Sequence, residues 1–488
     1  MSTTAPSAAT ANSAEANIPT HPLIINGKPH TTSSSFPVFC PKTGEHLHNF
    51  SSASISDTDA AISAAENAYP AWRSLPPNQK RDIFLKAAGI MESRAEEMRK
   101  NTVQETGAAE GWAAFDQGLS SEILRDVAGR ISSIAGSIPA TAQEDVTALV
   151  YKEPYGVVLA IAPWNAPHIL GVRSIAYPLA AGNTVILKAP EFSPMVSTGI
   201  VQALIDAGLP PGALNLIAHQ PSDAVAVTKH LISHPSIKKI NFTGSTNVGR
   251  IIAEFAGRNL KPVLLELGGK APAIVWEDAD VELAANQCAV GAFLHGGQIC
   301  MSTERVIVHE SVVEKFEEAF KNAVGGFAPE SSEAPVLVSK LGVEKTQRLL
   351  KDAVNKGAII LHGDANQPDN CTTMRPVVVK GMTKEMDLYY TESFGPTVSL
   401  MTIKTEEEAL ALANDTEYGL TAAVFTKDLQ RGLRMARGIE SGAVHINGMT
   451  VHDETALPHG GMKSSGYGRF GSSGLDEWVR TKTVTFRN

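Results

Sequence analysis

Hydrophobic positions in the first part of the chain repeat at helical spacing. From about Asp57 to Gly107, apolar residues recur every three or four positions, as at Ile62, Ala65 and Tyr69. This spacing places them on one face of each helix, so the region is predicted to form amphipathic helices.

The pattern changes from Tyr151 onward, where short apolar runs alternate with helix-compatible sequence. The runs are GVVLAIAP, NTVILKAP, ALNLIA, KKINFTG and PVLLELGG, followed between about Lys270 and Met449 by APAIV, ERVIV, TVSL and AVHIN. Alternating strands and helices predict parallel, doubly wound sheets, and hence an α/β fold. The 488 residues exceed what one core usually serves, so at least two domains are expected.

Composition narrows the classes of function. The chain has 42 Lys and Arg against 51 Asp and Glu, a net charge of −9, which provides no basic surface for nucleic acid or an anionic membrane. Its four cysteines, Cys40, Cys288, Cys300 and Cys371, lack the spacing of a zinc site or a disulfide framework. We therefore expect no bound metal, no nucleic-acid partner and a reducing compartment.

Two segments bear on localisation. Residues 1–20 are rich in Ser, Thr and Ala, carry no Lys or Arg, and are expected to form a disordered leader rather than a targeting peptide. The least polar long stretch, 155–172, is interrupted by Pro163, Asn165, Pro167 and His168, and is a poor candidate to span a bilayer. A cytoplasmic protein with no membrane partner is expected.

Two glycine patterns compete for a phosphate-binding role. GYGRFG, at 466–471, has the letters of a dinucleotide-binding loop, but it follows MKSS instead of an apolar strand and is given little weight. Segment 238–257 has the required context, because an apolar strand leads to Gly244 and Ser245 and then to an amphipathic helix. Free N–H groups at that helix start could hold a pyrophosphate, although an ordinary capped turn has the same signature.

Lys188 and Glu191 stand at the end of another predicted strand. If they face one crevice, they could bind ribose hydroxyls, and the carboxylate would repel the 2′-phosphate of NADP. A surface ion pair is the alternative.

Cys300 lies in the segment GGQICMSTERV. A lone cysteine in an α/β protein is more often an inert core residue than a nucleophile. Two polar residues at other strand ends favour the nucleophile. Glu266, in LLELGGK, is placed for general-base work, and the amide of Asn165, in IAPWNAP, could donate to a developing oxyanion.

A series of motifs then carries a family resemblance. In order they are PWN (163–165), KAPE (188–191), FTGSTNVG (242–249), LELGGK (265–270), GGQIC (296–300), ESFGP (392–396), YGLTAAVFT (418–426) and GGMKSSG (460–466). With this series, the chain from about Leu23 to its C-terminus resembles the aldehyde dehydrogenase superfamily. The resemblance implies a Rossmann-type coenzyme domain, an α/β catalytic domain and a small β bridging element.

The resemblance also implies domain boundaries and an assembly. The NAD-binding domain would comprise 21–132 and 153–265, the catalytic domain 266–470, and the bridging element 133–152 and 471–488. A protruding strand pair must cover its edge. Because members of this family cover it against another subunit, a homodimer or homotetramer is expected.

The resemblance assigns roles to the candidate residues. Cys300 would attack the aldehyde carbon, Asn165 would stabilise the oxyanion, and Glu266 would activate water to hydrolyse the thioester to the acid. The coenzyme would be NAD. Its contacts would be Lys188 and Glu191 at the adenosine ribose, Ser245 at the pyrophosphate, Glu392 at the nicotinamide ribose, and in addition Ile161, Ala162, Pro163, Trp164, Gly244, Leu267, Gly268 and Phe394.

A narrower resemblance concerns the substrate. GQICMSTERV and GYGRFGSSG are similar to segments of the branch that includes salicylaldehyde and vanillin dehydrogenases, so an aromatic aldehyde is expected. The pocket would be lined by Ala166, Ile169, Leu170, Arg173, Leu294, Ile299, Met301, Val451 and His459. Arg173 could contact a ring substituent or form a structural salt bridge. His295 and His459 depart from the Asn and Phe of many relatives. An aliphatic aldehyde dehydrogenase and a catalytically silent binding protein are the alternatives.

Overall fold

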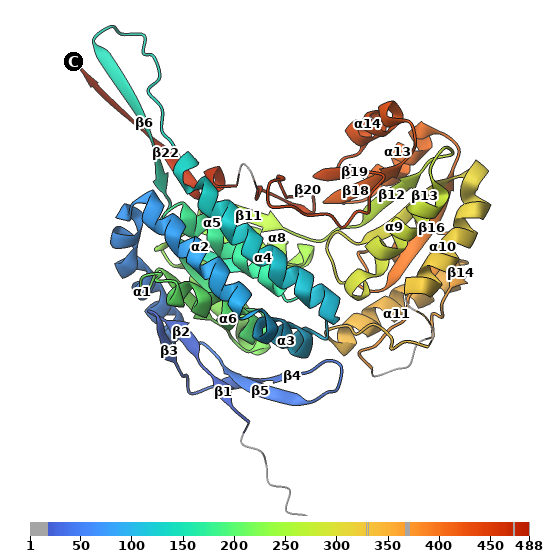
Figure 1. Cartoon of the computed structure of the whole chain (residues 1–488), viewed down its shortest axis with the longest axis horizontal. Coiled ribbons are helices and arrows are strands. Elements are labelled where there is room, and N and C mark those ends of the chain that lie inside the picture. The colour runs from blue at the N-terminus through green and yellow to red at the C-terminus, as the bar shows by residue number, and fades with distance from the viewer. Residues whose placement is uncertain (1–17, 328, 330, 367–370, 472–473, 488) are drawn as a thin grey trace, which may run out of the picture.

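The chain is organised around two large sheets, each with helices packed against it, and a narrow ribbon that projects from one of them (Figure 1). A computed structural model describes residues 18–487 apart from 328, 330, 367–370 and 472–473. Residues 1–17 of the expected leader lie outside the described residues, and the first strand, β1, begins at Thr20.

The first large sheet has the strand order β21-β11-β10-β7-β8-β9-β2-β3. Its strands are β2 (Leu23–Ile25), β3 (Lys28–His30), β7 (Val157–Ile161), β8 (Thr184–Lys188), β9 (Leu214–Ile217), β10 (Ile237–Thr243), β11 (Val263–Glu266) and β21 (Gly466–Tyr467). Strands β7 to β11 are parallel and are the five runs predicted from hydropathy. Since their spatial order is β9-β8-β7-β10-β11, the winding reverses between β7 and β10, as in a Rossmann fold. A ligand crevice is expected outside their carboxyl ends.

Helices cover both faces of this sheet. They are α1 (Ile55–Ser74), α2 (Pro77–Ser93), α3 (Ala95–Thr106), α4 (Glu110–Arg130), α5 (Pro167–Ala180), α6 (Pro194–Asp206), α7 (Ala224–Ser233) and α8 (Thr246–Arg258). The helical prediction for the region from Asp57 to Gly107 is confirmed by α1, α2 and α3. Ser54 and Asp57 form a capping box at the start of α1. Buried Trp72 of α1 donates from Nε1 to the carbonyl oxygen of Leu179 at 3.1 Å, which ties α1 to α5.

The second large sheet has the order β14-β15-β16-β13-β12-β18-β19 and is parallel except for β14. Its strands are β12 (Ala271–Val275), β13 (Thr303–His309), β14 (Ile359–His362), β15 (Val377–Lys380), β16 (Thr397–Ile403), β18 (Thr421–Phe425) and β19 (Ala443–Ile446). Its helices are α9 (Val281–Phe293), α10 (Val313–Phe327), α11 (Lys340–Asn355), α12 (Asp387–Tyr390), α13 (Glu406–Asn414) and α14 (Leu429–Gly438). The predicted runs APAIV, ERVIV, TVSL and AVHIN are strands here, and the two-sheet α/β prediction is confirmed.

Smaller sheets complete the fold. Strands β1 (Thr20–His21), β4 (Ser35–Phe39) and β5 (His46–Ser51) form one, and β17 (Tyr418–Gly419) pairs with β20 (Met462–Lys463). The projecting ribbon pairs β6 (Val146–Pro154) with β22 (Val479–Arg487) in antiparallel register (Figure 1). The side chains of β22 are exposed along almost its whole length. Within the described part of the chain, no helix is long and apolar enough to cross a membrane.

Candidate active site

The three candidate catalytic residues come from three different strand connections. Asn165 follows β7 in the loop that leads to α5, Glu266 is the last residue of β11, and Cys300 lies between α9 and β13. Strands β7 and β11 flank β10, so Asn165 and Glu266 stand at the same carboxyl edge of the first sheet. The fold therefore brings this edge against the loop of Cys300 from the second sheet.

The loop of Cys300 is held by a tight turn. His295, Gly296 and Gly297 have φ values of 51°, 65° and 74°. A Cβ at Gly297 would lie 2.2 Å from the carbonyl oxygen of Gly395, so only glycine fits there. The side chain of Gln298 donates to the carbonyl oxygen of His295 at 3.0 Å and accepts from the backbone N–H of Val338 at 2.9 Å. These bonds fix the backbone just before Cys300.

The surroundings of Cys300 disfavour the thiolate form of its side chain in the isolated protein. Cys300 is partly exposed, packs against the main apolar cluster, and forms no disulfide. Burial, and after it the carboxylates of Glu266 and Glu392, raise the pKa of Cys300 to about 12. A nucleophilic thiolate therefore requires that the proton be taken up as the substrate reacts.

Asn165 is buried and presents its amide from a fixed backbone. Its Nδ2 donates one hydrogen to the carbonyl oxygen of Gln298 at 2.9 Å, and the second N–H can point to an oxyanion. The indole Nε1 of Trp112 donates to the carbonyl oxygen of Asn165 at 3.0 Å. Trp112 in turn stacks on His295, with ring centroids 5.2 Å apart.

The backbone conformation at position 295 explains why His can stand where many relatives have Asn. Its φ of 51° lies in the left-handed region, where Asn and His are both enriched. Burial lowers the pKa of His295 to about 4, so the ring stays neutral against Trp112. His295 therefore packs beside the oxyanion residue without adding charge.

Glu266 has one engaged and one unengaged carboxylate oxygen. Its Oε2 lies 3.3 Å from Nε2 of His459, whereas Oε1 is buried and has no hydrogen-bond partner among the described residues. Gly466 of β21 pairs with Glu266, and a Cβ at Gly466 would lie 2.0 Å from the carbonyl oxygen of Leu265. The GYGRFG segment thus brings a backbone tightly against β11, which accounts for its glycine without a phosphate.

Sequence reasoning missed a buried ion pair next to the site. Lys270 Nζ lies 2.5 Å from Glu304 Oε2, and Glu304 also accepts from the backbone N–H of Ser393 at 2.8 Å. The adjacent Glu392 accepts from the backbone N–H of Gly269 at 2.8 Å. Burial and the charge of Glu304 raise the pKa of Glu392 to about 7. The lysine of the LELGGK motif, Lys270, was the signal in the sequence that could have pointed to this ion pair.

The apolar residues predicted to line the substrate site belong to the hydrophobic core around the first sheet. Ala166, Ile169, Leu170, Ile299, Met301 and Val451 are buried members of it, and Leu294 packs against it. Arg173 is also buried, but its guanidinium pairs with Asp453 and lies 5.7 Å from the centre of the Phe470 ring. The structural salt bridge considered for Arg173 is therefore present, and sequence reasoning did not identify Asp453.

The chain matches a known family over most of its length. The profile of the Aldehyde dehydrogenase family matches residues 29–484. The chain belongs to the aldehyde dehydrogenase family. It is therefore an oxidoreductase that acts on aldehydes with NAD(P).

Three relatives illustrate the similarity. Vanillin dehydrogenase of Pseudomonas sp. (strain HR199 / DSM 7063) is 44% identical over 96% of this chain and 98% of its own length. Salicylaldehyde dehydrogenase of Pseudomonas sp. (strain C18) is 39% identical over 91% of this chain and 94% of its own. The crystal structure of a salicylaldehyde dehydrogenase from Pseudomonas putida G7, complexed with salicylaldehyde, has a TM-score of 0.93 and 37% identity, and covers 96% and 98% of the two chains.

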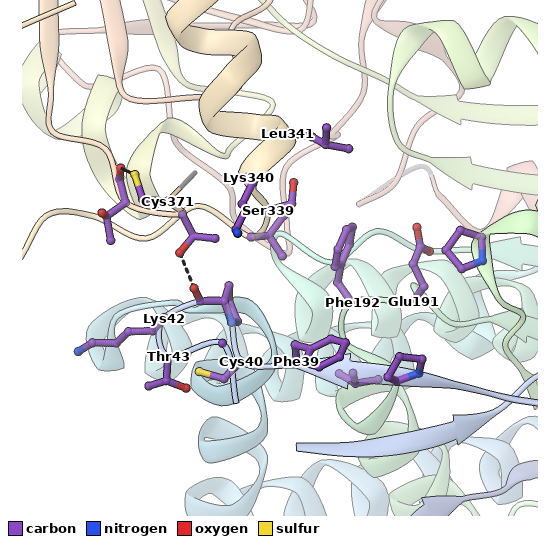
Figure 2. A pocket seen from close by; sticks show the side chains of 18 of the residues that line it. Phe39, Cys40, Lys42, Thr43, Glu191, Phe192, Ser339, Lys340, Leu341 and Cys371 are labelled. Carbon is purple, nitrogen blue, oxygen red and sulfur yellow. Dashed lines mark hydrogen bonds between the residues drawn. The ribbon is translucent and has the colours of Figure 1, made fainter. Parts of the chain in front are cut away.

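The coenzyme of an aldehyde dehydrogenase requires a ribose site, and the residues after β8 fit one. Lys188 Nζ lies 3.4 Å from Glu191 Oε2. Glu191 and Phe192 line a cavity of about 1140 Å³, and the start of α11 and the loop that follows β4 form other parts of its wall (Figure 2). Nearby, Nε2 of buried His219 has no hydrogen-bond partner among the described residues. Burial and Lys188 lower the pKa of His219 to about 4, which leaves a neutral acceptor for a hydroxyl.

The pyrophosphate and nicotinamide positions also fit. Ser245 caps α8, where free backbone N–H groups favour an anion. A Cβ at Gly249 would lie 2.5 Å from Leu267 Cδ2, so the helix start approaches the end of β11 closely. Trp164 and Phe394, from opposite sheets, meet edge to face with centroids 5.8 Å apart. Several of the predicted coenzyme residues are thus brought together.

Proposed function

We propose that this aldehyde dehydrogenase oxidises an aromatic aldehyde to its carboxylic acid, with NAD as coenzyme and a thioester on Cys300 as intermediate. The observation that carries the proposal is that the loop of Cys300 lies against the strand ends that carry Asn165 and Glu266. Asn165 donates to the carbonyl oxygen of Gln298 in that loop, and the Glu266 carboxylate acts, after burial, to raise the pKa of Cys300. Relatives named for vanillin and salicylaldehyde, and a related structure with salicylaldehyde bound, support the aromatic substrate.

The charge balance of the pocket wall also favours an uncharged aromatic ring. Arg173 is the one arginine or lysine among the predicted lining residues, and Asp453 neutralises it. An aliphatic aldehyde that carries a carboxylate would find no uncompensated cation in that wall. The small Ala166 and the apolar Ile169 and Leu170 favour a flat ring.

Glu191 favours NAD over NADP. Although burial alone would favour the neutral acid, the neighbouring Lys188 holds the pKa of Glu191 below its usual value. The side chain is therefore a carboxylate at neutral pH. It suits the two hydroxyls of an adenosine ribose and repels a 2′-phosphate.

Acylation uses Cys300 and Asn165. The Cys300 sulfur forms a bond to the aldehyde carbon as the thiol loses its proton to solvent water, and the carbonyl oxygen becomes an oxyanion. The free N–H of Asn165 and the backbone N–H of Cys300 donate to that oxyanion. Lys188, Glu191 and Ser245 would hold the NAD, which would supply a hydride acceptor for the thiohemiacetal carbon. Loss of that hydride would leave a thioester on Cys300.

Deacylation uses Glu266. The carboxylate takes a proton from a water molecule whose oxygen attacks the thioester carbon, and the C–S bond breaks to release the acid and the Cys300 thiol. The unengaged Oε1 of Glu266 is the available acceptor. A general base at this position favours hydrolysis over transfer of the acyl group to another thiol.

The ribbon of β6 and β22 supports a homodimer or homotetramer. Its unpaired edge and exposed Tyr151, Val484 and Phe486 would be covered by a second copy of the chain. Cys40, Cys288 and Cys300 form no disulfide, which favours a reducing, cytoplasmic location.

A substrate panel tests the proposal. Initial rates of NADH formation are measured with salicylaldehyde, vanillin, benzaldehyde and hexanal, each with NAD and with NADP. Higher kcat/KM for the aromatic aldehydes with NAD is expected. A preference for hexanal would refute the aromatic substrate, and a preference for NADP would refute the coenzyme assignment.

A further inference from the structure

Glu266 is the first in a row of four largely buried side chains that contact one another in sequence. His459 Nε2 lies 3.3 Å from Glu266 Oε2, and His459 Nδ1 lies 3.8 Å from Asp453 Oδ1. The other oxygen of Asp453 accepts from Arg173. The side chains of all four residues are at most 11% exposed.

The backbone fixes the His459 ring relative to Glu266. His459 and Phe470 exchange backbone hydrogen bonds of 3.1 and 2.9 Å. Four residues before Phe470, Gly466 pairs directly with Glu266 of β11. The ring and the carboxylate are thus attached to the same small group of paired strands, and Arg173 lies over the Phe470 ring.

Acidic and basic side chains alternate along the row. Although burial alone would favour the neutral acid, Arg173 and then His459 hold the pKa of Asp453 below its usual value, so Asp453 is a carboxylate at neutral pH. A protonated His459 ring would present one N–H to Glu266 and the other to Asp453. The charged and titratable groups around His459 are Glu266 on β11, Asp453, His452 and Glu454 on the loop after β19, Arg173 on α5, and Cys300.

We propose that His459 is a positioning residue for Glu266 in thioester hydrolysis. Its ring holds Oε2 of Glu266 and leaves Oε1 to take the proton of the attacking water, while the Asp453–Arg173 pair holds the ring. This inference rests on the proposed function, because it concerns the hydrolysis of the acyl group on Cys300.

The N–H donor at position 459 should therefore matter for deacylation and not for acylation. Hydrolysis needs Oε2 of Glu266 held in place and Oε1 free to accept the proton of the attacking water. A side chain that still donates an N–H at position 459 should keep this effect, and one without a donor should lose it.

An activated ester separates this step from oxidation. The probe p-nitrophenyl acetate acylates Cys300 without coenzyme, so its burst reports acylation and its steady state reports deacylation. We expect His459→Phe to keep the burst rate and to slow the steady-state rate by roughly tenfold. This loss is smaller than the contribution of a general base itself, which is about 10²–10⁴-fold. His459→Gln, which retains an N–H donor, should restore much of the rate. Asp453→Asn should act in the same direction as His459→Phe.

A matched control comes from the same loop. His452 pairs with Glu454, and its side chain is 41% exposed, so His452→Asn should leave both phases unchanged. Wild-type deacylation in His459→Phe would overturn the inference, as would equal losses of burst and steady state in His459→Phe and His459→Gln. Absence of any burst and of aldehyde oxidation in the wild-type enzyme would instead refute the proposed function.

Discussion

The carbonyl oxygen of Cys300 lies against Gly269, so closely that a Cβ at position 269 would stand 2.1 Å from it. Gly269 also donates its backbone N–H to Glu392. Glu266 ends the strand that leads into Gly269. A glycine with no room for a side chain thus fixes the loop of the nucleophile against the strand of the base.

Replacing this glycine should disable the enzyme. Gly269→Ala would push the Cys300 backbone away, and a misplacement of about 1 Å at a reacting group can cost roughly 10²-fold in rate. Steady-state kcat/KM measures the effect. Gly257→Ala is the control, because a Cβ there meets nothing within 4 Å, and its activity should be that of the wild type. Full activity in Gly269→Ala would contradict the described contact.

The oxyanion role of Asn165 predicts a loss in kcat. Asn165→Ala removes one preorganised donor, and such losses are about 10²–10³-fold. Coenzyme affinity, measured by quenching of tryptophan fluorescence, should stay at the wild-type value. A kcat equal to that of the wild type would refute the donor assignment.

The raised pKa of Cys300 makes its reactivity depend on pH. Because the pKa is raised to about 12, the thiolate fraction in the isolated protein grows about tenfold per pH unit across the neutral range. Alkylation by iodoacetamide, followed by peptide mass spectrometry, should accelerate accordingly. Glu266→Gln removes a carboxylate that raises this pKa, so alkylation should become faster at a given pH. A rate independent of pH would show that the thiolate is already formed.

Discrimination between coenzymes should depend on Glu191. Glu191→Gln removes the negative charge next to Lys188 and should raise kcat/KM with NADP relative to NAD. Asp223→Asn changes a carboxylate in the segment after β9 and should leave the ratio as it was. An unchanged ratio in Glu191→Gln would assign coenzyme selection to other residues.

Much of the fold followed from local pattern. Each apolar run ending in Gly, Pro or a polar turn became a parallel strand, because strands buried on both faces must be apolar along their length. The positions of Asn165 and Glu266 at strand ends followed from the same runs.

Sequence reasoning missed ion pairs whose two residues lie far apart along the chain. Arg173 and Asp453 are 280 residues apart, and Lys270 and Glu304 are separated by an entire helix and the loop of Cys300. No periodicity connects such pairs. His459 was placed at the pocket mouth as a polar substitution, and only the paired strands around Gly466 show that its ring lies next to Glu266.

The most direct test of the central claim is to trap the thioester. Glu266→Gln is mixed with benzaldehyde and NAD, and the intact mass of the protein is measured before and after one turnover. The account predicts an added benzoyl group on the peptide that contains Cys300, formed with one equivalent of NADH and absent from the Cys300→Ala variant. Formation of NADH without any acyl group on Cys300 would contradict it.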